Sequence, residues 1–259
     1  MEDNSFAFLK QSIAQMQSSP DYQANCQRFL QESTRLEAIS TELHTRKADL
    51  RAQCEQNTVR TEYASGSDLH RGFYCPSPVF DLIVGNTHRG KLLKRVTKAS
   101  KPSHEYGFDA DGRMLYCKTL HQDKVVYMEL LAYRENIVHG ITLDSQGFIS
   151  CITETVYRQD KPVQYLYGLC IHTQKALQCT ELRCEYYDYD EEGLCRSQMH
   201  QLNIPLQNIS DFIPEKYASL LRQPIYRGDQ YRFERKDGFL AGYTNENGDF
   251  YPARFQRKA

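Results

Sequence analysis

Alternating acidic residues before a glycine are the first candidates for chemistry in this sequence. An EF-hand loop binds Ca²⁺ through oxygens at positions 1, 3 and 5, with Gly at position 6 and Glu at position 12. With Gly193 at position 6, the first three ligands are the metal candidates Asp188, Asp190 and Glu192, but position 12 is Met199. The stretch YGFDADGRMLY, residues 106–116, fails at both ends when Gly112 stands at position 6. We therefore predict no metal and no other cofactor, and retain these three acidic residues only as candidates for a cation site.

A pair of carboxylates could instead act as general acid and general base in hydrolysis. Asp109 and Asp111 would point to opposite faces of a strand, so they would not converge on one substrate atom. The eight histidines are scattered, without an HxH or HExxH grouping, and Cys179 and Cys184 are too far apart for a CxxC zinc site and fit a single strand. No catalytic residue is predicted. An enzyme, either a hydrolase or metal-dependent, whose site is assembled from separated strands remains an alternative.

Composition narrows the function classes. The formal net charge of -1 argues against a broad nucleic-acid-binding face. No apolar run approaches the ~18 residues needed to cross a membrane. The beginning, MEDNSFAFLKQ, lacks the basic-then-apolar order of a secretion signal. The nine cysteines show no CxxC pairs and several lie in apolar segments, so we expect reduced core residues and a cytoplasmic location.

The N-terminal part predicts helices, because apolar residues recur there at helical spacing. Ser19 and Pro20 mark the start of a long helix, with no Gly or Pro until about residue 59. Its apolar residues Phe29, Leu36, Leu43 and Leu50 recur every seven residues. A coiled coil needs a second apolar position in each heptad, which is missing here. We expect this helix to pack against its own domain, and a structural or oligomeric role through the helix is an alternative.

Beyond a Gly-, Ser- and Pro-containing stretch the apolar period changes to two, and short polar turns separate the runs. This pattern predicts an α+β fold, in which N-terminal helices, one of them long, pack on a large twisted antiparallel β-meander. A short helical insertion is expected near residues 211–222. The predicted divisions are a helical segment over 1–62, a connector over 63–80 and an antiparallel sheet domain over 81–259. The run KVVYMELLAY, residues 124–133, is apolar on both faces and predicts a central strand covered on both sides.

The turns share a pattern. FDADGRM, LDSQGFI and YDEEGLC each place Asp three residues before Gly, and TNENGDF places Asn there. Asp and Asn bond their own backbone two residues on, and Gly accepts a positive φ, so Asp109 and Gly112 are expected to form a hairpin turn. YYDYDEEGL and YGFDADGRM resemble the tyrosine–aspartate repeats of Rhs-type bacterial polymorphic-toxin proteins, which read roughly Tyr-Asp-x-x-Gly-x-Leu. This resemblance implies a β-meander found in bacterial toxin and immunity systems.

One sheet face is the candidate interaction surface. If DEEG closes a hairpin, Glu181, Arg183, Glu185 and Tyr187 lie beside Arg196 and His200, and the preceding strand adds Tyr165 and Tyr167. Alternating charges with tyrosine and arginine are typical of protein recognition, although ordinary solvated sheets also show them. We therefore predict a non-enzymatic protein-binding module. The toxin-system resemblance extends this to a bacterial immunity or accessory protein that caps a toxin.

Overall fold

The computed structural model describes residues 4–67, 69–78, 89–97, 100–172, 177–205, 223–237 and 239–258. The described part contains the helices α1 (Asn4–Gln17), α2 (Pro20–Thr45) and α3 (Lys47–Asn57), and a 3-10 helix, η1 (Gly72–Tyr74). Its strands are β1 (Arg60–Ser65), β2 (Lys91–Leu92), β3 (His104–Phe108), β4 (Met114–His121), β5 (Lys124–Arg134), β6 (Ile137–Asp144), β7 (Ile149–Arg158), β8 (Lys161–His172), β9 (Leu177–Asp190), β10 (Gly193–Asn203), β11 (Ile225–Lys236), β12 (Phe239–Asn245) and β13 (Phe250–Lys258). The α+β class predicted from the sequence is confirmed.

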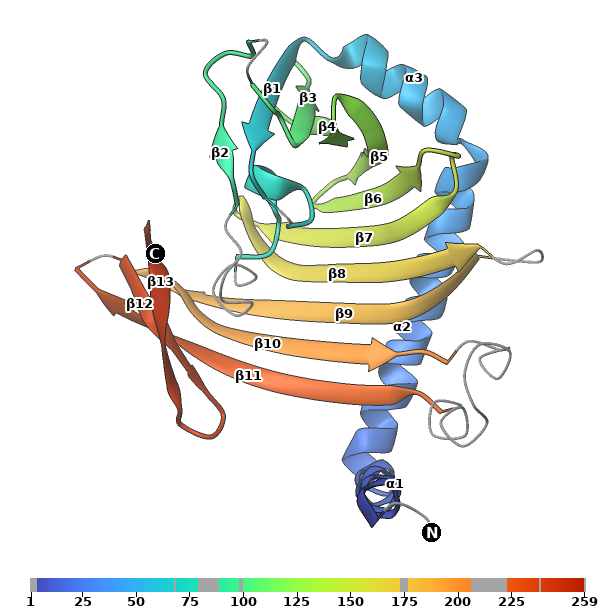
Figure 1. The fold of residues 1–259 in the computed structure, drawn as a ribbon, viewed down its shortest axis with the longest axis vertical. Helices are drawn as coiled ribbons and strands as arrows, with labels where there is room; N and C mark the ends of the chain where they lie inside the picture. The colour runs from blue at the N-terminus through green and yellow to red at the C-terminus, as the bar shows by residue number, and fades with distance from the viewer. Residues whose placement is uncertain are drawn as a thin grey trace.

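All thirteen strands form one antiparallel sheet, in the order β13 to β3 followed by β1 and β2 (Figure 1). From β3 to β13 each strand pairs with the next one in the chain, as the short polar turns predict. Only β1 departs from this order, because it lies between β3 and β2. The antiparallel meander is therefore confirmed for the described strands.

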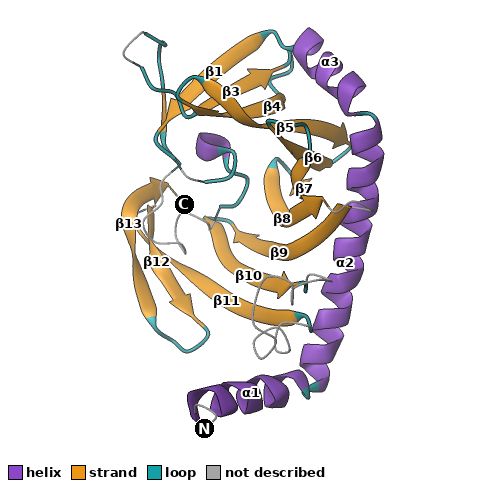
Figure 2. Cartoon of the chain, turned by 45° about the vertical axis from the view of Figure 1, so that its right-hand side comes forward, coloured by secondary structure: helices purple, strands orange, loops and turns teal. Residues whose placement is uncertain are grey.

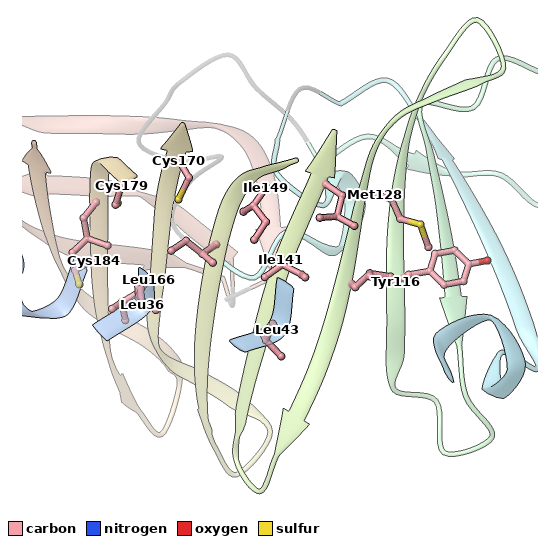
Figure 3. Packing of buried hydrophobic residues seen from close by; sticks show 14 of the residues in the cluster. Leu36, Leu43, Tyr116, Met128, Ile141, Ile149, Leu166, Cys170, Cys179 and Cys184 are labelled. Atoms are coloured by element: carbon pink, nitrogen blue, oxygen red, sulfur yellow. The ribbon is translucent and has the colours of Figure 1, made fainter. Parts of the chain in front are cut away.

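The long helix α2 crosses one face of this sheet. Ser19 is its N-cap residue and Pro20 occupies its first turn, as expected. Phe29, Leu36 and Leu43 are at most 4% exposed and belong to the same apolar cluster as buried residues of the strands. Figure 3 shows Leu36 and Leu43 among strand residues of this cluster. The helix thus buries its narrow apolar stripe against its own sheet, and this stripe is not available as an interface between copies of the chain.

The two faces of the sheet have different neighbours. The helix face, covered by α2 and α3, carries the main apolar cluster, which includes Leu130, Ile141 and Leu166. The other face, which we call the inner face, is the side toward which both ends of the sheet bend, and η1 lies against it (Figure 2). Strand β5 is buried on both sides, since Leu130 is 0% exposed and Leu131 is 3% exposed. This confirms the central position predicted for residues 124–133.

The repeated turns have the predicted geometry. The Oδ1 atom of Asp109 accepts the backbone N–H groups of Asp111 and Arg113 at 3.0 and 2.8 Å, and Gly112 has φ +80°. The turns at Asp144–Gly147 and Asn245–Gly248 repeat this arrangement. Backbone geometry therefore accounts for the recurring Asp and Gly.

The predicted domain divisions differ from what the structure shows. Strand β1 spans the expected boundary between residues 62 and 63 and pairs within the single sheet. The supposed connector is buried, because Leu69, Arg71, Cys75 and Ser77 are each at most 4% exposed. This stretch contains Gly, Ser and Pro and shows no apolar periodicity. Its burial depends on strands that are distant in the chain, so the local pattern did not predict it. The helical insertion expected near residues 211–222 lies outside the described residues.

The nine cysteines are free thiols, and seven of them are buried. This confirms their use as small core residues. None of the helices in the described ranges combines the length and the apolar character that crossing a membrane requires.

Candidate functional site

The candidate site lies on the inner face, where residues 69–78, called here the inner segment, cross the middle strands. The segment leaves β1 through a tight bend in which Arg71 and Gly72 both have positive φ, +57° and +50°. A positive φ is unusual for arginine, and surrounding contacts must hold it. These contacts come from three strands that are distant in sequence.

Arg71 makes the central contact with Glu129 of β5. Its Nε and Nη2 atoms donate to the two carboxylate oxygens at 2.7 and 2.6 Å, and Nη2 also donates to Oγ1 of Thr153 at 3.0 Å. Both charged side chains are 3% exposed. Burial alone would raise the pKa of Glu129, but the charges of Arg71 and His70 outweigh it and hold that pKa well below its ordinary value. The carboxylate is therefore ionised in the interior.

His70 and Tyr106 anchor the same bend. The Nδ1 atom of His70 lies 2.9 Å from the hydroxyl of Tyr165, and its Nε2 atom lies 3.3 Å from Glu129 without an aligned hydrogen bond. The Tyr106 hydroxyl donates to the Arg71 carbonyl at 3.0 Å and accepts the N–H of Phe73 at 3.1 Å. Together these bonds fix the backbone around Arg71.

The far end of the inner segment is held by β9. Ser77 is fully buried and its Oγ atom donates to Glu185 at 2.6 Å. The Tyr187 hydroxyl donates to the same carboxylate. Glu185 and Tyr187 are 1% and 4% exposed, so both hold the segment and neither is presented to solvent.

The structure separates the eight residues predicted to form one exposed face. Six lie on the inner face: Glu181, Arg183, Glu185, Tyr187, Tyr165 and Tyr167. Arg196 and His200 lie on the helix face, where His200 packs against Phe29 at a ring distance of 4.8 Å. Burial lowers the pKa of His200, which favours its neutral form. The expectation of a shared face was wrong.

A β-bulge causes this separation. Leu194 pairs with Tyr189, but the next pair is Arg196 with Asp188, so Cys195 is an extra residue in β10. One extra residue moves every later side chain to the other face. Without it, Arg196 would lie opposite Tyr187, as the simple hairpin predicts. The sequence gives no clear signal for this bulge.

The metal candidates do not belong to the site around the inner segment. Asp190 and Glu192 receive Nη1 of Arg235 at 2.9 and 3.3 Å, and Oδ1 of Asp190 also accepts the backbone N–H of Glu192 and of Gly193. These carboxylates close a turn and pair with arginine. In the ranges that the structure describes, no group of three His, Cys, Asp or Glu side chains is arranged to hold a metal ion.

Two hollows flank the inner segment, and Arg71 lines both. The first, the histidine hollow, has a volume of about 800 Å³ and is lined by His70, His104, His121, Tyr127, Cys151, Tyr167 and Leu169, among others. The second, the aromatic hollow, has a volume of about 580 Å³ and is lined by Tyr74, Phe108, Tyr133, Tyr157, Glu135 and Asp160, among others. Both volumes are in the range of ligand-binding clefts.

Cys151, which lines the histidine hollow, and Tyr165, which bonds His70, are poorly suited to covalent catalysis. Burial raises the pKa of the Cys151 thiol, which is 4% exposed, and keeps it protonated. Burial likewise raises the pKa of Tyr165, whose side chain is 1% exposed and out of reach of a bound molecule. His70 has Tyr165 at one ring nitrogen and Glu129 near the other. The contacts of His70 with Tyr165 and Glu129 hold the inner segment against the sheet.

Sequence reasoning missed this site, although one signal was present. Glu129 is the only charged residue between Val125 and Tyr133, in a strand predicted to be covered on both faces. A buried carboxylate requires a cation, which points to a buried arginine or lysine elsewhere in the chain. Nothing local identifies that partner as Arg71.

No protein-family model and no curated protein matches this sequence. The function is therefore inferred from the geometry of the inner face.

Proposed function

We propose that the protein is a binding module that holds another protein on its inner face, centred on the histidine hollow. The observation that carries this proposal is that exposed apolar side chains lie at the edge of the histidine hollow, next to the buried Arg71–Glu129 ion pair. Tyr127 and Leu169 line the hollow and are 44% and 40% exposed. Ile171, which is 36% exposed, lies two residues beyond Leu169 on the same strand.

This composition supports protein binding. Tyrosine is enriched at the centres of protein-recognition surfaces, and polar groups commonly surround such centres. Large apolar side chains exposed together are more often interaction sites than isolated ones. The Arg71–Glu129 pair already holds the inner segment in place, so binding would not require ordering of this segment.

The specific form that we propose is an immunity or accessory protein that caps a bacterial toxin in the cytoplasm. Its support is the resemblance of the FDADGRM and YDEEGLC turns to Rhs-type repeats. The alternative of an enzyme assembled from separated strands gains no nucleophile from the buried cysteines. Burial raises the pKa of Cys54 to about 11 and that of Cys184 to about 12.

The test is affinity capture from cells of the source organism, with identification by mass spectrometry. The candidate, together with the product of the neighbouring gene, is then produced in recombinant form and titrated calorimetrically. We expect Tyr127→Ala/Leu169→Ser to weaken binding at least ~30-fold, because hot-spot residues contribute about 2 kcal/mol or more. The matched control is Phe250→Ala/Tyr251→Ala, which removes two exposed rings from the distant β12–β13 hairpin. Equal binding by the two variants, or no protein that distinguishes them, contradicts the proposal.

A further inference from the structure

The aromatic hollow has a lining unlike that of its neighbour. It lies where the β3–β4, β5–β6 and β7–β8 turns meet, with Gly112, Glu135 and Asp160 contributed by these turns. Tyr74 of the inner segment and Tyr133 and Tyr157 of the sheet supply its rings. Aromatic walls with acidic groups at the rim are chemically suited to a cation.

The rings are fixed in place before any ligand arrives. The Tyr133 hydroxyl donates to the Met114 carbonyl at 2.7 Å, and Tyr74 packs edge-on against Phe108 at a ring distance of 5.4 Å. The hydroxyl of Tyr74 donates to Glu62. Burial raises the pKa of Tyr133 to about 12, so its phenol is neutral. Two guanidinium groups of the chain already lie against these rings, Arg113 at 5.7 Å from the Tyr133 centroid and Arg60 at 4.3 Å from the Phe108 centroid. Neutral rings attract a cation through their faces, and Tyr74 and Tyr157 supply further rings for a ligand cation.

The charged side chains that line the hollow are two arginines and two carboxylates. Its two cations, Arg71 and Arg113, are paired with Glu129 and with Asp109 and Asp111 respectively. Glu135 and Asp160 are exposed and make no ion pair within the described part of the chain. Since both arginines that line the hollow are already paired, Glu135 and Asp160 are the two lining carboxylates that a further cation can meet. By contrast, none of the described residues lining the histidine hollow is an Asp or Glu.

We propose that the aromatic hollow binds a guanidinium group, presented by an arginine side chain of the partner protein. A guanidinium is planar, stacks on tyrosine rings and can donate to carboxylates in pairs, which an ammonium group cannot do equally well. The hollow adjoins the histidine hollow across Arg71, so one partner surface can occupy both. The source of the arginine rests on the proposed function, whereas the chemistry of the hollow does not.

The experiment uses the full chain labelled with 3-fluorotyrosine and the probe Nα-acetyl-arginine methylamide, observed by ¹⁹F NMR. The Tyr133 and Tyr157 resonances are assigned with Tyr133→Phe and Tyr157→Phe. We expect saturable shifts of both resonances with a Kd in the millimolar range, as a few kcal/mol of interaction implies. The neutral probe Nα-acetyl-glutamine methylamide should produce no saturable shift.

The decisive comparison is between two double variants that remove negative charges at the hollow and elsewhere. Glu135→Gln/Asp160→Asn should weaken the arginine probe about tenfold, because each lost charge removes part of a charge-assisted bond. Glu191→Gln/Glu246→Gln changes the net charge equally at exposed turns elsewhere and should leave the affinity unchanged. Absence of saturable shifts, or equal weakening by the two double variants, overturns the inference.

The two proposals fail separately. If the arginine probe does not bind but Tyr127→Ala/Leu169→Ser still weakens partner binding, the guanidinium site is wrong and the protein-binding function stands. If the probe binds but no protein distinguishes that variant from the Phe250→Ala/Tyr251→Ala control, the cation site stands and the proposed function fails.

Discussion

Arg71 and Glu129 form a two-bond ion pair in which both side chains are 3% exposed, although 58 residues separate them in the chain. The pair joins a residue with positive φ to the central strand β5. It fixes the inner segment on the inner face and thereby creates the wall between the two hollows. The stability of this pair and the shape of the candidate site are therefore coupled.

Arg71→Met should lower the free energy of unfolding by about 3–5 kcal/mol, because it leaves the Glu129 carboxylate buried without a cation. The double variant Arg71→Met/Glu129→Gln should recover a large part of that loss, since it removes both charges. Urea denaturation measures both effects. Arg51→Met, which breaks an exposed pair with Glu55, should cost no more than about 1 kcal/mol. Equal losses for Arg71→Met and Arg51→Met would show that the buried pair has no special role.

Gly140→Ala, on β6, should disturb the Arg71–Glu129 ion pair. A Cβ atom at this glycine would lie 2.2 Å from Oε1 of Glu129 and 2.4 Å from Oγ1 of Thr153, so these groups must move. We expect a loss of about 1–3 kcal/mol, the usual cost of overpacking. In a Glu129→Ala background the added methyl group meets no carboxylate and should cost less, and a double-mutant cycle measures the difference. If the effects of Gly140→Ala and Glu129→Ala on the free energy of unfolding are strictly additive, the added methyl group does not act through the Glu129 carboxylate.

Acid should weaken the contact between α2 and the sheet through Glu154. Burial raises the pKa of this carboxyl, but hydrogen bonds from His139 and Arg35 lower it more, to about 2, from an ordinary value of 4.5. Because the folded-state pKa is the lower one, the stabilisation is complete above about pH 4.5 and is lost as the pH falls toward 2. Glu154→Gln should flatten the dependence of unfolding free energy on pH in that window. Glu55→Gln, at an exposed pair, is the control, and an unchanged slope for Glu154→Gln would contradict the assignment.

Leu36→Ala should destabilise the protein by about 2–5 kcal/mol, because Leu36 is 1% exposed in the main core. The unfolding midpoint should not change with protein concentration, since the α2 stripe packs on its own sheet. Met16→Ala, at a residue 42% exposed on α1, should change stability by no more than about 0.5 kcal/mol. A midpoint of the wild type that rises with concentration and no longer does so in Leu36→Ala would indicate a dimer interface along α2.

Replacing Asp109 should reduce stability more than replacing Asp111. Asp109→Ala loses two backbone hydrogen bonds at the turn and should cost about 1 kcal/mol. The Asp111 side chain is 75% exposed and, among the described residues, bonds Arg113 alone, so Asp111→Ala should leave the thermal midpoint nearly unchanged. Adding Ca²⁺ should shift neither midpoint. A Ca²⁺-dependent rise that both substitutions abolish would restore the acidic pair as a cation site.

Short-range patterns were sufficient for the features that depend on neighbouring residues. The Asp109–Gly112 turn follows from one side chain bonding the backbone within four residues. The stripe of Phe29, Leu36 and Leu43 is a matter of helical spacing, and its narrow width correctly favoured packing on the sheet over a zipper. Polar turns between alternating runs likewise indicated the antiparallel meander.

The candidate site could not be predicted in this way. The face on which Arg196 and His200 lie was reversed by a single bulge at Cys195, which alternation cannot detect. The inner segment, with its Gly, Ser and Pro, resembled a surface connector. Its burial depends on Glu129, Tyr165 and Glu185, each from a different strand.

The sequence by itself determined the elements and their connections, because hairpin turns and helical stripes are set by residues a few positions apart. Only the tertiary structure decided which polar groups meet, because the bend of the sheet brings residues separated by 58, 95 and 108 positions onto one inner face. A charge such as Glu129 requires a buried partner on physical grounds, but the identity of that partner depends on which chain segment fits the enclosed space. Here that segment carries Arg71.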